Sequence, residues 1–253
     1  MLKGLQSIRY EKHIDLPMFG EEKQLKLLNS KVAIIGAGGL GCPVCLYLCA
    51  SGVGHITLID DDEISLSNLP RQTLYSYDDL GKNKVNIAKE KLNKAYPDCN
   101  IEAVNERITD KNAEKYFADS DIIIDATDNF KTRYLLNEIA IQFSKPLLSG
   151  SVVHYTGQVI TFHPTKNYNY PCYACLYPEQ PDNHAVPACL DSGVLSPVTG
   201  TIGSIMATQV IKQLTNMDKE SDHNELLIYS ALDNKFDKIK IKKSDGCKIC
   251  AIS

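Results

Sequence analysis

The stretch KVAIIGAGGLGCPVC, from Lys31 to Cys45, decides the fold class. Its short apolar run, rich in β-branched residues, is typical of a buried strand, and the glycines after it fit the pattern G-x-G-x-x-G. This order predicts a strand, a tight turn and a helix whose N-terminus binds phosphate groups. The turn alone does not distinguish a dinucleotide from ATP, because both carry phosphates and ribose hydroxyls. The candidate phosphate-binding glycines are Gly36, Gly38, Gly39 and Gly41.

Strands and helices alternate over residues 31–150, which predicts an α/β fold with a Rossmann-like, mostly parallel central sheet and helices on both faces. Residues 1–30 are predicted to form a helical lead-in. From about residue 150 the strands come closer together, so we expect a C-terminal mixed or antiparallel extension over 151–253. Residues 1–253 are treated as a single domain whose nucleotide-binding half is 31–150.

The composition excludes several classes of protein. Among the 253 residues, 27 are basic and 31 are acidic, which gives a net charge of -4, so nucleic acid is not an expected partner. No apolar run approaches the roughly 18 residues that span a bilayer. The charged N-terminal segment has no apolar region typical of a signal peptide. We therefore expect a cytoplasmic protein with no membrane partner.

Polar residues follow the expected end of the next strand. Asp60 ends the stretch HITLID at the position where an acidic residue commonly binds ribose. Asn68, Arg71 and Gln72 come soon after it, at the sheet edge where open α/β sheets bind ligands. Lys84 opens the following predicted helix. A guanidinium and a lysine suit a triphosphate, because negative charge shifts onto pyrophosphate during attack at the α-phosphorus.

A carboxylate follows another buried strand. Asp128 in DATDN is a candidate ligand for Mg²⁺, which takes one or two carboxylates together with phosphate oxygens. Asn129 beside it is a further candidate for the nucleotide site. Taken singly, Arg71 or Lys84 is more simply interpreted as a solvated surface charge, but their positions at successive strand ends favour a site. The sequence thus favours ATP and Mg²⁺, and a NAD-dependent oxidoreductase is the alternative.

Two C-x-x-C pairs stand out among the nine cysteines. Each pair can supply two thiolates from one turn, so together they suit a tetrahedral structural Zn²⁺ site. A redox dithiol is the alternative, and it would need only one pair. The four candidate zinc ligands are Cys172, Cys175, Cys247 and Cys250.

The remaining cysteines are expected to have other roles. Cys42, Cys45 and Cys49 are at helical spacing, which is typical of small buried residues on one face of a helix. Cys99 has no evident partner. Cys189 lies on a loop, and it is either a dispensable thiol or a nucleophile whose pKa would have to be lowered.

Together, these motifs resemble the E1-like adenylyltransferases of the MoeB and ThiF type. The resemblance runs from about Arg9 to Cys250 and rests on GAGGLG, LIDDD, SLSNLPRQ, DATDN, CYACLYP and CKIC. Members of this family use Mg-ATP to adenylate the C-terminal glycine of a ubiquitin-like sulfur carrier protein, and they release pyrophosphate. They are homodimers with structural zinc on two C-x-x-C pairs. The resemblance implies that residues 151–253 bind the carrier and the zinc ion.

The resemblance also implies individual roles. It places Gly39 at the phosphates and Asp60 at the ribose, and it makes Asp128 the ligand of Mg²⁺. The residues that it places in contact with the phosphates are Asn68, Arg71 and Lys84. In some members, a cysteine at the position of Cys189 links covalently to the carrier or passes on sulfur.

One departure from the family pattern concerns the N-terminus. The family has two arginines in RYxRQ, and the second reaches the nucleotide of the partner subunit. This sequence reads RYEKH, so Arg9 is present and Lys12 stands at the second position. A lysine keeps the charge but lacks the planar fork of donors, which leaves the contact across the dimer open.

The carrier itself is not identified by the sequence, because carriers for thiamine and for the molybdenum cofactor both end in Gly-Gly. We expect a separate protein to donate the sulfur. An E1-like enzyme that acts on another acid, such as a peptide or a tRNA base, is a further alternative.

Overall fold

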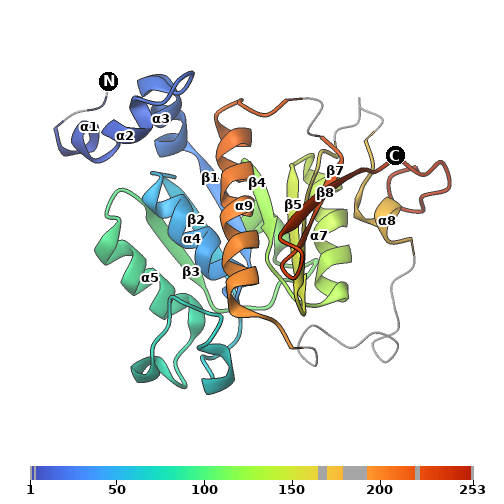
Figure 1. Ribbon diagram of the computed structural model, residues 1–253, viewed down its shortest axis with the longest axis horizontal. Helices are drawn as coiled ribbons and strands as arrows, with labels where there is room; N and C mark the ends of the chain where they lie inside the picture. Colours follow the sequence, from blue (N-terminus) through green and yellow to red (C-terminus); the bar gives the residue numbers. More distant parts are fainter. Residues whose placement is uncertain (1, 3, 165–169, 179–192, 220–222, 252–253) are drawn as a thin grey trace.

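The computed structural model describes residues 2, 4–164, 170–178, 193–219 and 223–251 (Figure 1). In this part of the chain, the strands form one eight-stranded sheet in the order β3-β2-β1-β4-β5-β6-β7-β8. The strands are β1 (Lys31–Ile35), β2 (His55–Ile59), β3 (Asn100–Val104), β4 (Ile122–Asp125), β5 (Leu147–Val153), β6 (Thr156–Phe162), β7 (Glu225–Ser230) and β8 (Lys235–Lys240).

The sheet has a parallel part and an antiparallel part. Strands β3, β2, β1, β4 and β5 pair in parallel, in an order typical of Rossmann-like sheets. Strands β6, β7 and β8 extend this sheet with antiparallel pairings. The predicted mixed α/β fold is therefore confirmed. Residue 150 lies within β5, so the parallel and antiparallel parts share one continuous sheet.

Helices cover both faces of the sheet, and α9 runs across the front of it in Figure 1. Side chains of α4, α5 and α9 bury one face, and those of α6 and α7 bury the other. The helices of the described residues are α1 (Leu5–Arg9), α2 (Glu11–Ile14), α3 (Gly20–Asn29), α4 (Gly41–Ala50), α5 (Lys84–Ala95), α6 (Ala113–Phe117), α7 (Phe130–Phe143), α8 (Tyr173–Leu176) and α9 (Ser196–Leu214).

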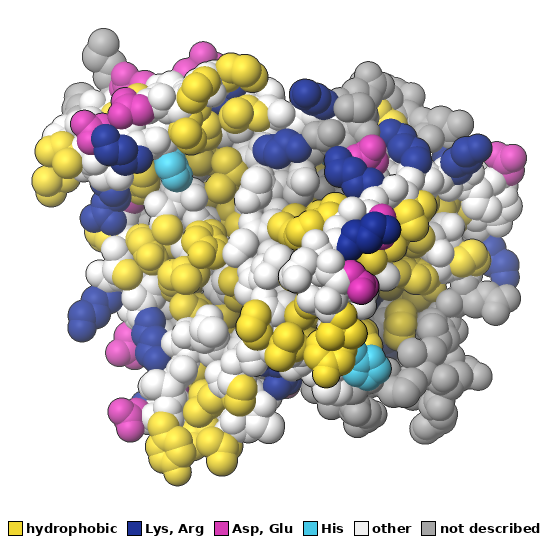
Figure 2. Space-filling model, in the orientation of Figure 1, with side chains coloured by type: hydrophobic (Ala, Val, Ile, Leu, Met, Phe, Trp, Pro, Cys, Tyr) yellow, Lys and Arg dark blue, Asp and Glu magenta, His cyan; other side chains and the backbone are white. Residues whose placement is uncertain are grey.

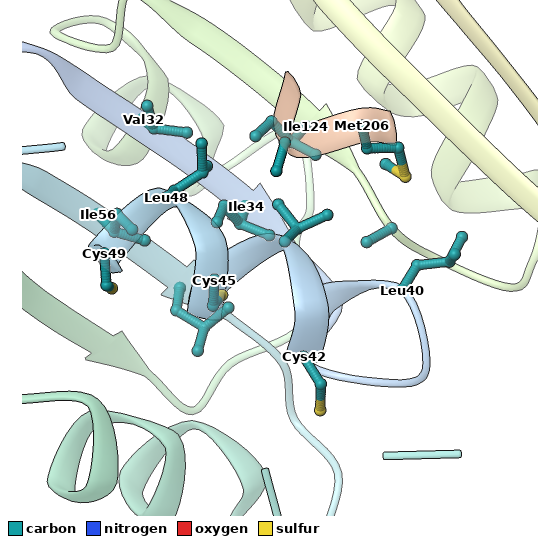
Figure 3. Close-up of a cluster of buried hydrophobic side chains, with 14 of the residues drawn as sticks. Val32, Ile34, Leu40, Cys42, Cys45, Leu48, Cys49, Ile56, Ile124 and Met206 are labelled. Carbon is teal, nitrogen blue, oxygen red and sulfur yellow. The ribbon is translucent and has the colours of Figure 1, made fainter. Parts of the chain in front are cut away.

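The core follows from the alternation of side chains along the buried strands. On β1, Val32 and Ile34 face α4 and α9, whereas Ala33 and Ile35 face the other helical layer. Figure 3 shows Leu48 of α4 and its neighbours in the first of these two layers. A central parallel strand is covered on both faces, so apolar residues occupy all of its buried positions.

The cysteines of α4 are buried as predicted, and Cys42, Cys45 and Cys49 are each 1% exposed. Cys99, for which the sequence shows no evident partner, is buried in the core as well. The Sγ atoms of Cys99 and Cys49 lie 3.4 Å apart in the core. Cys49 lies near the end of α4 and Cys99 directly precedes β3, and both thiols belong to the same buried layer of the core.

The glycine turn between β1 and α4 has very little space for side chains. Gly36 has a φ of +98°, a conformation that favours glycine. A Cβ atom at Gly41 would lie 1.9 Å from the carbonyl oxygen of Gly36. The turn therefore depends on glycine for its backbone conformation and for the close approach of the helix to the strand end.

None of the helices in the described ranges combines the length and the apolar character that a bilayer crossing requires.

Replacing Gly41 by alanine is expected to destabilise the fold by about 3 kcal/mol, because the added methyl group would overlap the Gly36 carbonyl. Urea unfolding followed by circular dichroism measures this change. Gly200→Ala in α9 is the control, since no atom of the described residues outside the helix backbone lies within 4 Å of its added methyl group. That change should stabilise the protein by up to about 1 kcal/mol. Wild-type stability for Gly41→Ala would contradict the close packing.

Candidate functional site

A cavity of about 790 Å³ opens at the carboxyl ends of the parallel strands. It lies where the strand order reverses between β1 and β4, which is the usual ligand position in such sheets. The turn after β1 lines one side, and the loop after β4 lines the other. The predicted site residues that line it are Gly36, Gly38, Gly39, Asp60, Arg71, Gln72, Asp128 and Asn129.

Asp60 connects the end of β2 to the glycine turn. Its carboxylate accepts hydrogen bonds from the backbone N–H of Ala37, at 2.7 Å, and from that of Asp62, at 2.8 Å. Burial raises the pKa of Asp60, and the positive charge of Lys84 opposes this rise. The hydrogen bond from Ala37 therefore holds the glycine turn on Asp60, and Asp60 also lines the cavity.

Lys84 is not a solvated surface charge, because it is only 4% exposed. Its Nζ lies 2.7 Å from a carboxylate oxygen of Asp62 and 4.0 Å from one of Asp60. Lys84 lies beneath these two carboxylates and is not among the residues that line the cavity. A contact between its ammonium group and a phosphate therefore stays a prediction.

The segment after β2 presents a guanidinium and an amide to the cavity. The carbonyl of Asn68 accepts hydrogen bonds from the backbone N–H of Arg71, at 3.1 Å, and from that of Gln72, at 3.0 Å. Arg71 Nη1 donates to the carbonyl of Ser67 at 2.9 Å. Gln72 is 3% exposed, and its Oε1 has no hydrogen-bond partner among the described residues. Asn68 itself is not among the residues that line the cavity.

The loop after β4 carries Asp128 into the cavity with an exposed side chain. The Asn129 side chain accepts a hydrogen bond from the backbone N–H of Thr132 at 2.9 Å and so caps the N-terminus of α7. Arg133, in the first turn of α7, is buried and lines the same cavity.

Sequence reasoning missed two arginines at this site. Arg107, after β3, forms an ion pair with Asp61 at 3.2 Å, and both residues line the cavity. Arg133 follows DATDN within a few residues, and its place in the largely apolar helix NFKTRYLLNEIAIQFS was the one available signal. Neither arginine belongs to a recognised motif, so only their positions in the fold identify them.

The two N-terminal cations lie far from this cavity. Arg9 Nε is 3.3 Å from a carboxylate oxygen of Asp98, which precedes β3 and so lies at the opposite end of the strands. Lys12 is exposed, and it pairs with Glu11 at 3.2 Å and with Asp15 at 3.6 Å. Neither residue lines the cavity of its own chain. Cys189 lies outside the described residues.

The four cysteines of the C-x-x-C pairs converge on one point. Sγ–Sγ distances are 4.0 Å for Cys172–Cys175, 3.7 Å for Cys172–Cys247 and 3.4 Å for Cys175–Cys250. A tetrahedral ion with metal–sulfur bonds near 2.3 Å separates its sulfur ligands by about 3.8 Å. The group could therefore hold one metal ion.

One thiol of this cluster ionises more readily than an ordinary cysteine. Burial acts to raise the pKa of Cys247, but hydrogen bonds from the backbone N–H groups of Cys250 and Ile249 outweigh it and lower the pKa to about 7. A thiolate is the form that binds metal. The loop of the first pair also packs on α7, because Asn137 Oδ1 accepts a hydrogen bond from the backbone N–H of Tyr173 at 2.9 Å.

Residues 10–249 match the ThiF family. The chain is 39% identical to the sulfur carrier protein adenylyltransferase of Thermus thermophilus, over 96% of this chain and 90% of that protein. It is also 39% identical to the SAMP-activating enzyme E1 of Haloferax volcanii, over 98% of this chain and 90% of that protein.

A longer relative and a solved structure have the same region in common with this chain. The adenylyltransferase and sulfurtransferase MOCS3 of Drosophila sechellia is 41% identical over 96% of this chain, which spans 53% of that protein. The crystal structure of E. coli MccB with ATP superimposes with a TM-score of 0.78 and 26% sequence identity. That match covers 90% of this chain and 68% of the other.

Replacing Lys84 by methionine is expected to destabilise the protein by about 2 kcal/mol at neutral pH, because two carboxylates lose their buried cation. Burial already raises the pKa of Asp60, so the folded state binds a proton more tightly than the unfolded chain does. Such a group favours folding at acidic pH and loses that contribution as the pH rises through its folded pKa. Removal of Lys84 raises that pKa further.

The loss of stability should therefore shrink as the pH falls toward the ordinary range of a carboxyl group, about 4. Urea unfolding at several pH values measures it. Lys82→Met, two residues away at an exposed position, is the matched control and should leave stability unchanged. A loss that does not depend on pH would contradict the role of Asp60.

Proposed function

The chain belongs to the ThiF family, and from this we propose that it is an ATP-dependent enzyme that adenylates the C-terminal glycine of a ubiquitin-like sulfur carrier protein. One observation carries the proposal. A cavity at the reversal of strand order brings the glycine turn, Arg71 and Asp128 together in a chain whose relative over nearly its full length is named a sulfur carrier protein adenylyltransferase.

The residues around the cavity divide the work of holding ATP. The N-terminus of α4 and the glycine turn present backbone N–H groups, which suit phosphates. Asp60 would accept hydrogen bonds from the ribose hydroxyls. Arg71 and the amide NH2 group of Gln72 would donate hydrogen bonds to phosphate oxygens, and the buried Lys84 would add positive charge nearby.

The chemistry needs no general base, because the carboxylate of the carrier is already ionised at neutral pH. One of its oxygens attacks the α-phosphorus of ATP and forms a new P–O bond. The bond from this phosphorus to the bridging oxygen breaks, and pyrophosphate leaves with the electron pair. The products are an acyl-adenylate and pyrophosphate. The contribution of the protein is therefore to position both reactants and to stabilise the charge on the leaving group.

Magnesium fits the residues at the cavity. The Asp128 carboxylate is exposed there, and no ion pair or hydrogen bond engages it within the described ranges. A free carboxylate beside phosphate oxygens is the donor set that Mg²⁺ prefers. When bound, the ion would neutralise the charge of the phosphates. Asp128 would hold it, and Asn129 would fix the start of α7 beside it.

Zinc is the metal that we propose for the four-cysteine cluster. Four thiolates at tetrahedral spacing are typical of structural zinc sites, and such a site leaves no open position for chemistry. The ion would join the C-terminal segment around Cys247 to the loop around Cys172. Its role would be to stabilise the fold.

Sulfur for the activated carrier would come from a separate protein. In the described part of the chain, every cysteine is either buried in the core or a member of the metal cluster. Cys189, the candidate for a sulfur-transfer thiol, lies outside the described residues, and its role stays a prediction. Pyrophosphate–ATP exchange with each carrier separately would decide whether the carrier serves thiamine or molybdenum cofactor synthesis.

We also propose that the protein acts as a homodimer. The N-terminal segment exposes large apolar side chains, with Leu5 at 81% and Ile8 at 73% on α1 and Met18 at 78% between α2 and α3, and Figure 2 shows hydrophobic side chains on the surface of this segment. Arg9 and Lys12 lie at the opposite end of the sheet from the cavity of their own chain. In a dimer, a second copy of the chain could present its nucleotide to them.

Pyrophosphate–ATP exchange tests the function. Purified protein with Mg²⁺ is expected to catalyse exchange with one Gly-Gly carrier, which would also identify the pathway. Asp128→Ala should reduce the rate by about 100-fold or more, because the metal-bound phosphates lose their ligand. Asp119→Ala, at an exposed surface position, is the control and should keep the wild-type rate. Exchange with none of the carriers would redirect the search to another acid substrate, such as a peptide.

Metal analysis tests the cysteine cluster. Each chain is expected to contain a single zinc ion, and Cys250→Ser should lose the ion together with several degrees of thermal stability. Cys99→Ala is the matched control, because it removes a buried thiol elsewhere in the core and should retain the zinc. Full zinc content in Cys250→Ser would contradict the assignment.

A further inference from the structure

We infer that Arg133 is a positioning residue for Asp128, and that it acts together with the buried carboxylate of Asp125 by fixing the backbone of Thr127. This inference rests on the proposed function, because it takes Asp128 as the residue that holds Mg²⁺ with ATP. It assigns a role to a buried ion pair between Asp125, the first residue of DATDN, and Arg133, which belongs to no recognised motif.

Asp128 depends on its backbone for its position. Its side chain is exposed, and no hydrogen bond or ion pair holds it within the described residues. Its orientation in the cavity is therefore set by the two residues beside it in the chain. Asn129 is held as the N-cap of α7. Thr127 is held on its other side by the buried pair.

Arg133 binds the carbonyl of Thr127. The side chain is 7% exposed, and its Nη2 donates to that carbonyl at 2.8 Å and approaches the carbonyl of Gly150 at 3.5 Å. Its Nε lies 3.8 Å from a carboxylate oxygen of Asp125. One planar guanidinium thus spans the end of β4, the loop before Asp128 and the neighbouring strand β5.

Asp125 holds the other polar groups of Thr127. Its Oδ1 accepts hydrogen bonds from the Thr127 backbone N–H, at 3.0 Å, and from the Thr127 hydroxyl, at 2.6 Å. Its Oδ2 accepts one from the hydroxyl of Ser149 at 2.6 Å. Asp125 is 1% exposed, so these bonds are shielded from water. The N–H, the hydroxyl and the carbonyl of Thr127 are therefore all bound, immediately before Asp128.

A residue that orients a metal ligand can change the affinity for the metal without contacting the metal itself. Groups that orient a ligand commonly change metal affinity by 10- to 100-fold when they are mutated, about as much as the proposal requires. Lysine would keep the charge of Arg133 but could not reach two carbonyls and a carboxylate with one planar fork. The substitution Arg133→Lys therefore tests geometry at constant charge.

ATP binding to the full-length protein, measured by calorimetry with Mg²⁺ and separately with EDTA, gives the readout. Mg²⁺ is expected to tighten ATP binding to the wild type. Arg133→Lys should reduce this tightening by about tenfold and leave the affinity in EDTA unchanged. Asp128→Asn should also reduce it. The double variant should match Asp128→Asn within about twofold, because Arg133 acts through Asp128.

Leu136→Ala is the matched control on the same helix. Leu136 is fully buried and does not line the cavity, so its truncation should lower the thermal midpoint without changing the effect of Mg²⁺. Ser149→Ala is a milder change at the same carboxylate, and it should shift the Mg²⁺ effect in the same direction by a smaller factor. It supplies the test if Arg133→Lys does not fold.

Two results would overturn the inference. The first is an equal loss of affinity with Mg²⁺ and with EDTA in Arg133→Lys, which would show a structural role or a direct contact with the nucleotide. The second is a multiplicative loss in the double variant. Absence of pyrophosphate exchange with every carrier would contradict the proposed function. The calorimetric comparison of the variants is independent of that assay, because it needs only ATP and Mg²⁺. A wild type whose ATP affinity does not depend on Mg²⁺ would overturn the assignment of Asp128 to Mg²⁺, and with it this inference, whereas the proposed adenylation would still be decided by pyrophosphate exchange.

Discussion

The parallel pairing of β1 with β4 is the constraint on which the rest of the site depends. Ile35 lies opposite Asp125 in this pairing, so both strands end at the same level of the sheet. The chain then leaves β1 toward α4 on one face and leaves β4 toward α7 on the other. The two connections diverge, and the crevice between them is the cavity. Gly36 allows this, because any side chain there would overlap the Ala126 carbonyl.

On each side of the cavity, a buried cation lies beside one or two carboxylates. Lys84 lies beneath Asp60 and Asp62 on the β2 side, and Arg133 lies beside Asp125 on the β4 side. Buried ion pairs add little net stability, because desolvation opposes their attraction. Their value here is geometric. They hold the glycine turn and the loop before Asp128 at the ends of the strands. The polar groups of both segments therefore have fixed positions at the cavity.

The cysteine cluster extends the same scaffold on the other side of α7. Its first pair lies on a loop whose backbone is bound by Asn137 of this helix, and its second pair comes from the end of the described chain. A metal ion held by both pairs would join the segment after β8 to the loop that Asn137 of α7 binds, and α7 begins at Phe130 beside the cavity.

The sequence by itself determined what depends on neighbouring residues. The strand, glycine turn and helix after Lys31 follow from local pattern, and Asp60, Arg71 and Asp128 follow strand ends that can be recognised in the same way. The spacing within each C-x-x-C pair is equally local. These patterns can be recognised in a single sequence, because hydrophobic periodicity, turn residues and cysteine spacing each involve only a few neighbouring residues.

Only the tertiary structure decided which of these pieces meet and which charges are buried. In the sequence Lys84 looks like a surface residue, but the fold buries it at the start of α5, and Cys99 meets Cys49 only in the packed core. Arg133 is close to Asp125 in sequence, yet its burial depends on the packing of α7. The physical reason is that burial and the meeting of distant segments depend on strand order, which no local pattern encodes.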